Sequence, residues 1–197
     1  MPISTQPALH PLLRERWSSR SFDPAHELAD DELVRLLEAA RWAPSAGNSQ
    51  PWAFLVLKRG EAGHGRFAAT LSRGNTSWVP KASVVLVSLF KNGDDEDPDL
   101  TYSDYAEYDL GQSVAHLTVQ AQSMGLGVHQ FAGFDHDAVA TGFAVPPNWK
   151  VTTGIAVGRY AGPADGSVDP TWDGRERVRR PLSTFAFGGR FGESRWS

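Results

Sequence analysis

The sequence contains no cysteine, which excludes disulfides, zinc–thiolate sites, iron–sulfur clusters and cysteine nucleophiles. It also lacks an apolar run near the roughly 20 residues of a membrane-spanning helix, and it lacks the apolar segment and cleavage site of a signal peptide. Positive charge is not in excess, because 19 basic and 23 acidic residues give a formal charge of −4. We therefore expect a soluble, cytoplasmic protein that binds neither membrane nor nucleic acid.

The common catalytic motifs are absent as well. The chain has no Walker P-loop and no GxGxxG, HExxH or GxSxG motif. Its six histidines are scattered, and the spacing of His129, Asp135 and His136 fits no standard metal site. The acidic stretch within residues 91–104 lacks the alternating ligands of an EF-hand, so we interpret it as an exposed loop.

Hydrophobic periodicity predicts helices and strands that alternate along the chain. Helices are expected at 9–16, 31–42, 62–72, 105–124 and 135–143, and strands at 52–58, 83–90, 127–131 and 151–159. Asp30 or Asp31 is expected to cap the second helix, and Gly125 to end the fourth. This interleaving favours one α/β-type domain over residues 1–197. A turn-rich linker is expected at 161–174. The aromatic, glycine-rich tail, 183–197, is too short for a core of its own and is expected to pack on another surface.

Two arginine-containing segments offer donors for a phosphate. The segment RWSSRSF, residues 16–22, places two arginines around hydroxyl groups. The segment RVRRPL, residues 177–182, places Arg177 and Arg179 on one face of an extended chain. The planar guanidinium group suits a phosphate, and Ser18 adds a neutral donor. Taken alone, each segment is more typical of a solvated surface.

Two further segments suit a flat heterocycle. In APSAGNSQPW, residues 43–52, small residues let a planar ligand approach the backbone, and Asn48 and Gln50 supply donors and acceptors. In GLGVHQFAGFD, residues 125–135, three glycines bracket a short strand whose end could offer backbone N–H groups. Taken singly, these segments are also consistent with a polar helix–strand connection and with a helix C-terminus followed by a buried strand.

Together, the four segments supply a dianion site, with Arg16, Arg20, Arg177 and Arg179, and a heterocycle site, which is what flavin mononucleotide (FMN) requires. In this combination and order the sequence resembles the nitroreductase family of FMN-dependent oxidoreductases, from residue 14 to about residue 182. The resemblance implies an α+β domain around a mixed, mostly antiparallel sheet flanked by helices. It also implies an intertwined homodimer with two FMN sites at the interface, which would give the tail, residues 183–197, a partner.

The resemblance assigns roles to individual residues. Arg16 and Ser18, with Trp17 in the same segment, should bind the FMN phosphate together with Arg177 and Arg179. Arg20 should lie near the N1/O2 edge of the flavin and act as the catalytic residue, by stabilising negative charge there.

The remaining cofactor-binding residues should contact the flavin ring. Asn75 is expected beside the pyrimidine edge, and the backbone of Ala132 and Gly133 beside N5 and O4. The other subunit should contribute Pro44, Ser45, Ala46 and Asn48. Two positions depart from some members of the family: Trp78 replaces a flavin-contacting lysine, and Ala132 replaces a glutamate.

The activity implied by the resemblance is hydride transfer from NAD(P)H to flavin N5, followed by reduction of a nitroaromatic, quinone or related small acceptor in a ping-pong cycle. Other reactions on the same fold remain open: dehalogenation, flavin fragmentation and heterocycle dehydrogenation. So does a flavin-binding protein without turnover, in which Trp78 or Trp172 blocks the flavin face. Tyr102, Tyr105 and Tyr108 are candidates for a wall of the acceptor pocket or, alternatively, for ordinary helix packing.

Overall fold

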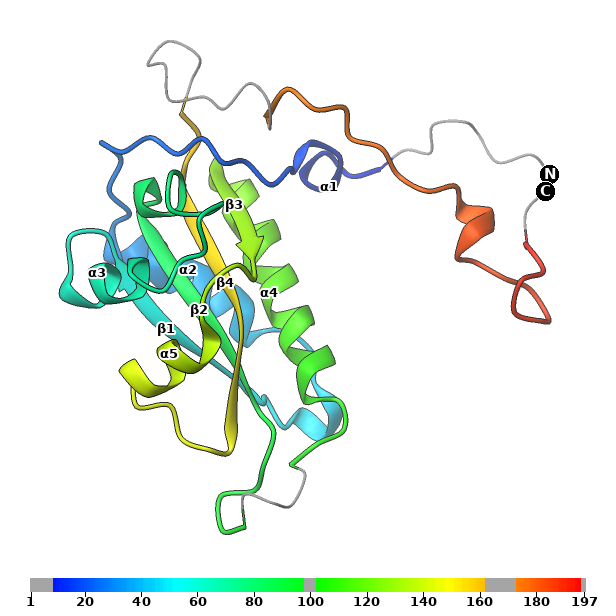
Figure 1. Cartoon of the computed structure of the whole chain (residues 1–197). Coiled ribbons are helices and arrows are strands. Elements are labelled where there is room, and N and C mark those ends of the chain that lie inside the picture. The colour runs from blue at the N-terminus through cyan, green and yellow to red at the C-terminus, as the bar shows by residue number, and fades with distance from the viewer. Residues whose placement is uncertain (1–8, 98–101, 162–172, 196–197) are drawn as a thin grey trace.

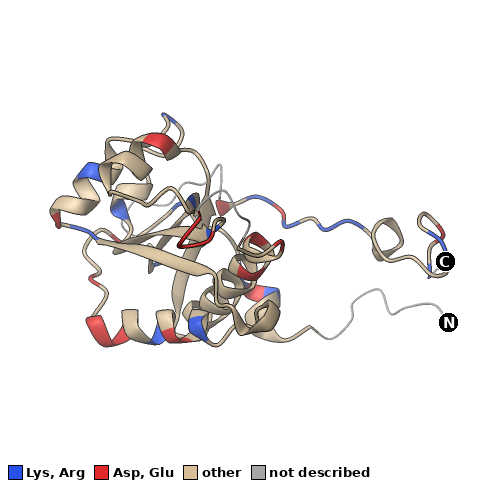
Figure 2. Cartoon of the chain, turned by 90° about the horizontal axis from the view of Figure 1, so that it is seen from below, with Lys and Arg blue, Asp and Glu red and all other residues tan. Residues whose placement is uncertain are grey.

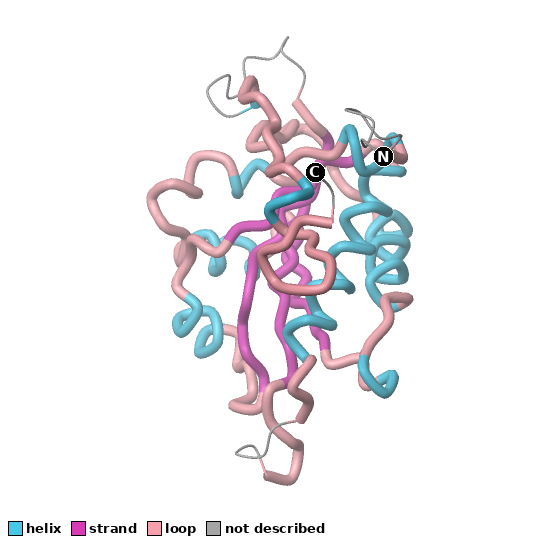
Figure 3. Tube along the Cα trace, turned by 90° about the vertical axis from the view of Figure 1, so that its right-hand side faces the viewer, coloured by secondary structure: helices cyan, strands magenta, loops and turns pink. Residues whose placement is uncertain are grey.

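The computed structural model describes residues 9–97, 102–161 and 173–195. A four-stranded sheet forms its centre, with helices on both faces (Figures 1 and 3). The strands are β1 (Trp52–Lys58), β2 (Val84–Lys91), β3 (Leu126–Phe131) and β4 (Trp149–Arg159), and their order across the sheet is β1-β2-β4-β3. All three pairings are antiparallel. The predicted α+β class with helices flanking the sheet is thereby confirmed, and where a mixed, mostly antiparallel sheet was expected, every pairing among the described strands is antiparallel.

The central strand β2 explains why the sheet is covered on both faces. All eight of its residues are buried, and alternate side chains enter different cores. Val84, Leu86 and Phe90 face one core, whereas Val85 and Val87 face the other. A continuous apolar run is typical of a strand buried on both faces.

The two long helices cover the first face. Helix α2 (Asp30–Arg41) packs against helix α4 (Ala106–Ser123), and both contribute to the first core. The predicted aspartate cap of α2 was wrong: Ala29 is the N-cap, and its N–H donates to Oε2 of Glu32 at 3.0 Å. Asp30 and Asp31 lie in the first turn instead, where negative charge is favourable.

Three shorter helices complete the fold. Helices α3 (Ala62–Ala68) and α5 (His136–Gly142) lie with the second core, and α1 (Pro11–Glu15) lies near the C-terminal half of α4. Helices α1 and α3 are shorter than predicted. Gly125 follows α4 with a φ of 73°, in the left-handed conformation that ends a helix.

Residues 174–195, which we call the C-terminal arm, extend away from the sheet and helices (Figure 1). The arm contains a short 3-10 helix, Leu182–Thr184, and a bridge between Phe187 and Ser194. Phe185 is 53% exposed and Phe191 is 94% exposed. Figure 2 shows that basic residues concentrate where the arm leaves the body. Within this chain the arm therefore has no core of its own, and packing on another surface stays a prediction.

The acidic segment is less open than expected. Lys91, predicted to begin an exposed loop, is the last residue of β2 and only 9% exposed. Its Nζ lies 2.5 Å from Oδ2 of Asp95 and 4.3 Å from the ring centroid of Tyr102. Residues 98–101 of this loop and most of the linker expected at 161–174 lie outside the described residues. Among the described helices, none is long and apolar enough to cross a membrane.

Candidate functional site

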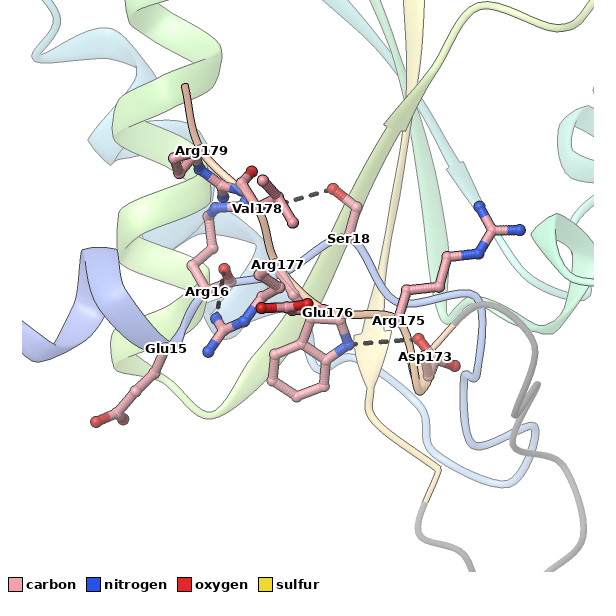
Figure 4. A pocket seen from close by; sticks show the side chains of 10 residues that line it. Glu15, Arg16, Ser18, Asp173, Arg175, Glu176, Arg177, Val178 and Arg179 are labelled. Carbon is pink, nitrogen blue, oxygen red and sulfur yellow. Dashed lines mark hydrogen bonds between the residues drawn. The ribbon is translucent and has the colours of Figure 1, made fainter. Parts of the chain in front are cut away.

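A surface pocket of about 720 Å³ lies between the segment that follows α1 and the start of the C-terminal arm (Figure 4). Its lining combines basic, acidic and aromatic side chains: Glu15, Arg16, Trp17, Ser18, Asp173, Arg175, Glu176, Arg177, Val178 and Arg179. The two arginine segments of the sequence, about 160 positions apart, therefore meet at one place. We call this place the anion pocket.

The electrostatics of the anion pocket centre on Arg16. Burial lowers the pKa of Arg16, and the positive charges of Arg179 and Arg177 lower it further. Arg16, Arg177 and Arg179 thus gather three positive charges at this place, and the acidic residues Glu15 and Glu176 also line the pocket. In Figure 4, Arg175 points away from this group of three arginines. Gathering like charges is unfavourable unless an anion compensates them, so the arrangement suits a phosphate.

Hydrogen bonds fix this arrangement to the backbone. Nη1 of Arg177 donates to the carbonyl oxygens of Arg14, at 2.7 Å, and Arg16, at 3.3 Å. Nη1 of Arg16 donates to Oγ of Ser18 at 3.4 Å. The arm is therefore attached to the N-terminal segment through one of the predicted phosphate ligands.

Asp173 is a second attachment point, which the sequence analysis missed. Its Oδ1 accepts from the indole N–H of Trp17 and from the backbone N–H of Arg20, each at 3.3 Å. Its Oδ2 accepts from the hydroxyl of Ser21. An aspartate in the stretch WDGRER carries no local signal of this role, because its partners lie more than 150 positions away.

Arg20 leads from the anion pocket toward the second core. Its guanidinium carbon lies 5.6 Å from the ring centroid of Trp78, a contact of the cation–π type. Trp78 is 4% exposed and packs against Phe131 and His129. It is therefore a core residue beneath Arg20, which does not fit the role of an aromatic cover on an open flavin face. Trp172, the other candidate cover, lies outside the described residues.

The same line of contacts continues to Asn75 and Gly133. The indole N–H of Trp78 donates to Oδ1 of Asn75 at 3.2 Å, and Nδ2 of Asn75 donates to the carbonyl of Gly133 at 2.9 Å. A Cβ at Gly133 would lie 2.5 Å from Nδ2 of Asn75, so any other residue at this position would displace the Asn75 amide. Arg20, Asn75 and the Ala132–Gly133 backbone, three of the predicted ring contacts, thus lie along one connected row.

The fourth predicted group lies elsewhere. Ser45, Ala46 and Asn48 belong to the connection between α2 and β1, near the first turn of α4, because the N–H of Ala46 donates to Oδ2 of Asp109 at 2.9 Å. The anion pocket adjoins the other end of α4, where Trp17 and Gln122 line one small cavity. The 13 helical steps from Asp109 to Gln122 span about 20 Å. Figure 1 shows the two ends apart, so one chain does not bring all predicted contacts together.

The three tyrosines proposed for a wall of the acceptor pocket differ in their surroundings. Tyr105 and Tyr108 are 61% and 68% exposed, so they do not serve as packing residues within this chain. The hydroxyl of Tyr102 donates to the carbonyl of Ser49 at 3.2 Å. In the part of the chain that the structure describes, no three histidine, aspartate or glutamate side chains are grouped as metal ligands.

The fold and the pocket define an α+β protein with an arginine-lined pocket beside a row of polar and aromatic residues. The model of the Nitroreductase family matches residues 13–159, which is more than half of the chain. The chain therefore belongs to the nitroreductase family.

Two relatives and one solved structure are similar to this chain. An uncharacterized 15.4 kDa protein in the ask 5′ region of Mycolicibacterium smegmatis is 37% identical over 128 residues, covering 64% of this chain and 82% of that protein. An oxygen-insensitive NADPH nitroreductase of Helicobacter acinonychis is 34% identical over 87 residues, covering 42% of this chain and 41% of that protein. A crystal structure described as an oxidoreductase containing FMN has a TM-score of 0.83 at 29% identity, covering 98% of this chain and 97% of that one.

Proposed function

We propose that this protein is an FMN-dependent NAD(P)H oxidoreductase that reduces nitroaromatic, quinone or related small acceptors. The observation that carries the proposal is the convergence of Arg16, Arg177 and Arg179 in one pocket, beside a row that leads through Arg20 to Asn75. The proposal is supported by the similar structure described as containing FMN and by the relative named as an NADPH nitroreductase.

The donors of the anion pocket fit the phosphate of FMN. Guanidinium groups and a hydroxyl are the groups that bind a phosphate dianion. Of the acidic residues nearby, Asp173 is engaged by three donors, from Trp17, Arg20 and Ser21. Its carboxylate is thereby hydrogen-bonded by three uncharged donors.

When bound, FMN would supply two-electron transfer between a nicotinamide and an acceptor. The residues of this chain would orient it. Arg20, seated on Trp78, would place positive charge where negative charge develops on reduction, which is preorganised electrostatic stabilisation. The backbone N–H groups of Ala132 and Gly133 would face the ring edge, and Asn75 would hold that backbone in place through its hydrogen bond to the carbonyl of Gly133. This scheme requires no nucleophilic side chain, which agrees with the absence of cysteine.

We further propose a homodimer, in which residues 44–48 of one chain complete the flavin site of the other. Within one chain, residues 44–48 lie near one end of α4 and the anion pocket lies near the other end. This separation supports a site that is shared between two chains. The exposed aromatic residues of the C-terminal arm support it too, since apolar side chains gathered on an extended segment are typical of an interface.

The absorption spectrum of the purified protein tests the proposal. We expect the bands of bound FMN, which NADPH or NADH bleaches under anaerobic conditions and which nitroaromatics or quinones restore. Comparing the two nucleotides gives the donor preference, and a panel of acceptors distinguishes the reductase from the other reactions of the fold. A colourless preparation that takes up no added FMN would refute the proposal.

A further inference from the structure

The connection between α2 and β1 has an unusual backbone for an exposed loop. Three of its residues, Gly47, Asn48 and Gln50, have positive φ values of 58°, 56° and 47°. Glycine and asparagine tolerate this conformation, but a long side chain such as that of Gln50 rarely adopts it. Such a conformation persists only where surrounding contacts hold it in place.

Several contacts hold this loop. Oγ of Ser45 accepts from the N–H of Gln50 at 3.0 Å, inside the loop. From outside, the hydroxyl of Tyr102 donates to the carbonyl of Ser49 at 3.2 Å. The contact from the body of the fold is made by Asp109 of α4, whose Oδ2 accepts from the N–H of Ala46 at 2.9 Å.

Asp109 is a buried acid that the proposed chemistry does not use. It is 2% exposed, within the face of α4 that also buries Ser113 and Leu117. A carboxylate in such a place requires hydrogen-bond donors. Asp109 lies in the first turn of α4, where a negatively charged side chain is favourable. Its carboxylate accepts a hydrogen bond from the N–H of Ala46 and so contacts the loop directly.

We infer that Asp109 is a positioning residue, which holds residues 44–50 in the conformation that presents Ser45 and Asn48 to the flavin ring. The inference rests on the proposed function, since it concerns the ring side of the same site. Asp109 acts through the loop backbone, at the end of α4 opposite the anion pocket. Its loss therefore weakens contacts with the ring and leaves contacts with the phosphate unchanged.

Binding of two flavins separates these effects, because riboflavin has the ring of FMN without the phosphate. The full-length protein, stripped of bound flavin, is titrated with each. Leucine has a similar shape to aspartate and no acceptor. Asp109→Leu should therefore weaken the binding of FMN and of riboflavin by the same factor, about tenfold for one hydrogen bond to a charged group. Asp109→Asn retains an oxygen acceptor for the N–H of Ala46 and should stay close to the wild type.

Two further variants complete the design. Glu107→Leu removes an exposed acid from the same turn of α4 and should leave both affinities unchanged. Tyr102→Phe removes the hydrogen bond from the Tyr102 hydroxyl to the carbonyl of Ser49 and should repeat the equal loss for both flavins, which keeps the test available if Asp109→Leu fails to fold.

Unchanged binding in Asp109→Leu, a loss confined to FMN, or an equal loss in Asp109→Asn and Asp109→Leu would overturn the inference. A wild-type protein that binds neither flavin would instead refute the proposed function.

Discussion

At the scale of single residues, the site depends on charges that act at short range. Arg16 has its pKa lowered by burial and by two neighbouring arginines. Arg20 lies on Trp78, which in turn holds Asn75. In the proposed site, the arginines around Arg16 bind the phosphate, and Arg20 with Asn75 lies at the ring edge. Substitutions at the phosphate should therefore affect FMN binding alone, whereas substitutions at the ring edge should affect the reactivity of the flavin.

Replacing Arg179 by alanine should weaken FMN binding by about tenfold to a hundredfold, the range expected for one charge-assisted contact. Riboflavin binding should not change, because riboflavin lacks the phosphate. Fluorescence titration with both flavins measures the ratio, and Arg66→Ala, an exposed arginine at α3, is the control. An equal loss for both flavins would remove Arg179 from its phosphate role.

Replacing Arg20 by alanine should slow the reduction of bound flavin by NAD(P)H by on the order of a hundredfold, while FMN stays bound. The charge that develops on reduction then lacks its nearby cation. Stopped-flow absorbance follows the reduction, and Arg20→Lys, which keeps the charge, should recover part of the rate. An unchanged rate in Arg20→Ala would contradict the assigned role.

Because the ring of His129 is buried, we expect the free energy of unfolding of the protein to fall in mild acid. Burial is the main cause that lowers the pKa of this histidine, and the charges of Arg20 and Arg16 add to the effect. The folded chain thus holds this ring neutral, with Nδ1 2.9 Å from the carbonyl of Ser19, whereas the unfolded chain takes up a proton below about pH 6.5. Stability contributed by the neutral ring is full above that pH and is lost below it.

His129→Asn keeps a donor near Ser19 and does not titrate. The free energy of unfolding of the wild type should therefore fall more steeply between about pH 7 and about pH 5 than that of the variant, by up to about 1.4 kcal/mol per pH unit. His26 and His64, whose pKa values burial also lowers, act equally in both proteins. Urea unfolding at the two pH values decides the matter, and parallel curves would speak against the prediction.

At the scale of elements, the sequence predicted what local periodicity controls. Leu33, Leu36 and Ala40 recur on one face of α2, and the apolar run of β2 is buried on both faces. Local patterns failed where distant partners decide the outcome. The N-cap of α2 is Ala29, because the carboxylate of Glu32 accepts a hydrogen bond from the N–H of Ala29.

Only part of the candidate site could be predicted from the sequence, namely the part that residue type reveals. The arginines of both segments were identified because guanidinium groups have a recognisable chemistry. Asp173 was missed because its three donors are distant in sequence. Asp109 did carry a readable signal, a charged residue on the buried face of a helix, four positions before buried Ser113.

The attachment of the C-terminal arm should depend on Asp173. Asp173→Ala removes the acceptor of Trp17, Arg20 and Ser21, so only the hydrogen bonds of Arg177 still attach the arm and its arginines are held less firmly in the anion pocket. FMN affinity should fall about as far as in Arg177→Ala, and the double variant should show little additional loss, because both substitutions disturb one arrangement. Fully additive losses in the titrations would mean that the two residues act independently.

At the scale of the whole molecule, the two ends of α4 carry two halves of one proposed site. The anion pocket lies toward one end, and Ser45 and Asn48 lie near the other. A symmetric dimer that brings unlike ends together would form two complete sites. The arm, with exposed Phe185 and Phe191, would join the two chains.

A chain that ends at Arg180 should therefore lose most of its dimer and keep the fold of its body. Sedimentation velocity measures the oligomeric state, and far-ultraviolet circular dichroism measures the fold. A truncated chain that remains a stable dimer would show that the arm is not required for association.

The most direct measurement uses a mixed dimer. One chain carries Arg179→Ala and the other Asn48→Ala, with different affinity tags, so that the heterodimer can be isolated and titrated with FMN. If each site draws its phosphate ligands from one chain and its loop from the other, one site of the heterodimer collects both substitutions and the other none. We predict one FMN bound per dimer with wild-type affinity. Two sites that are each weakened by one substitution, and none of wild-type affinity, would contradict a site shared between chains.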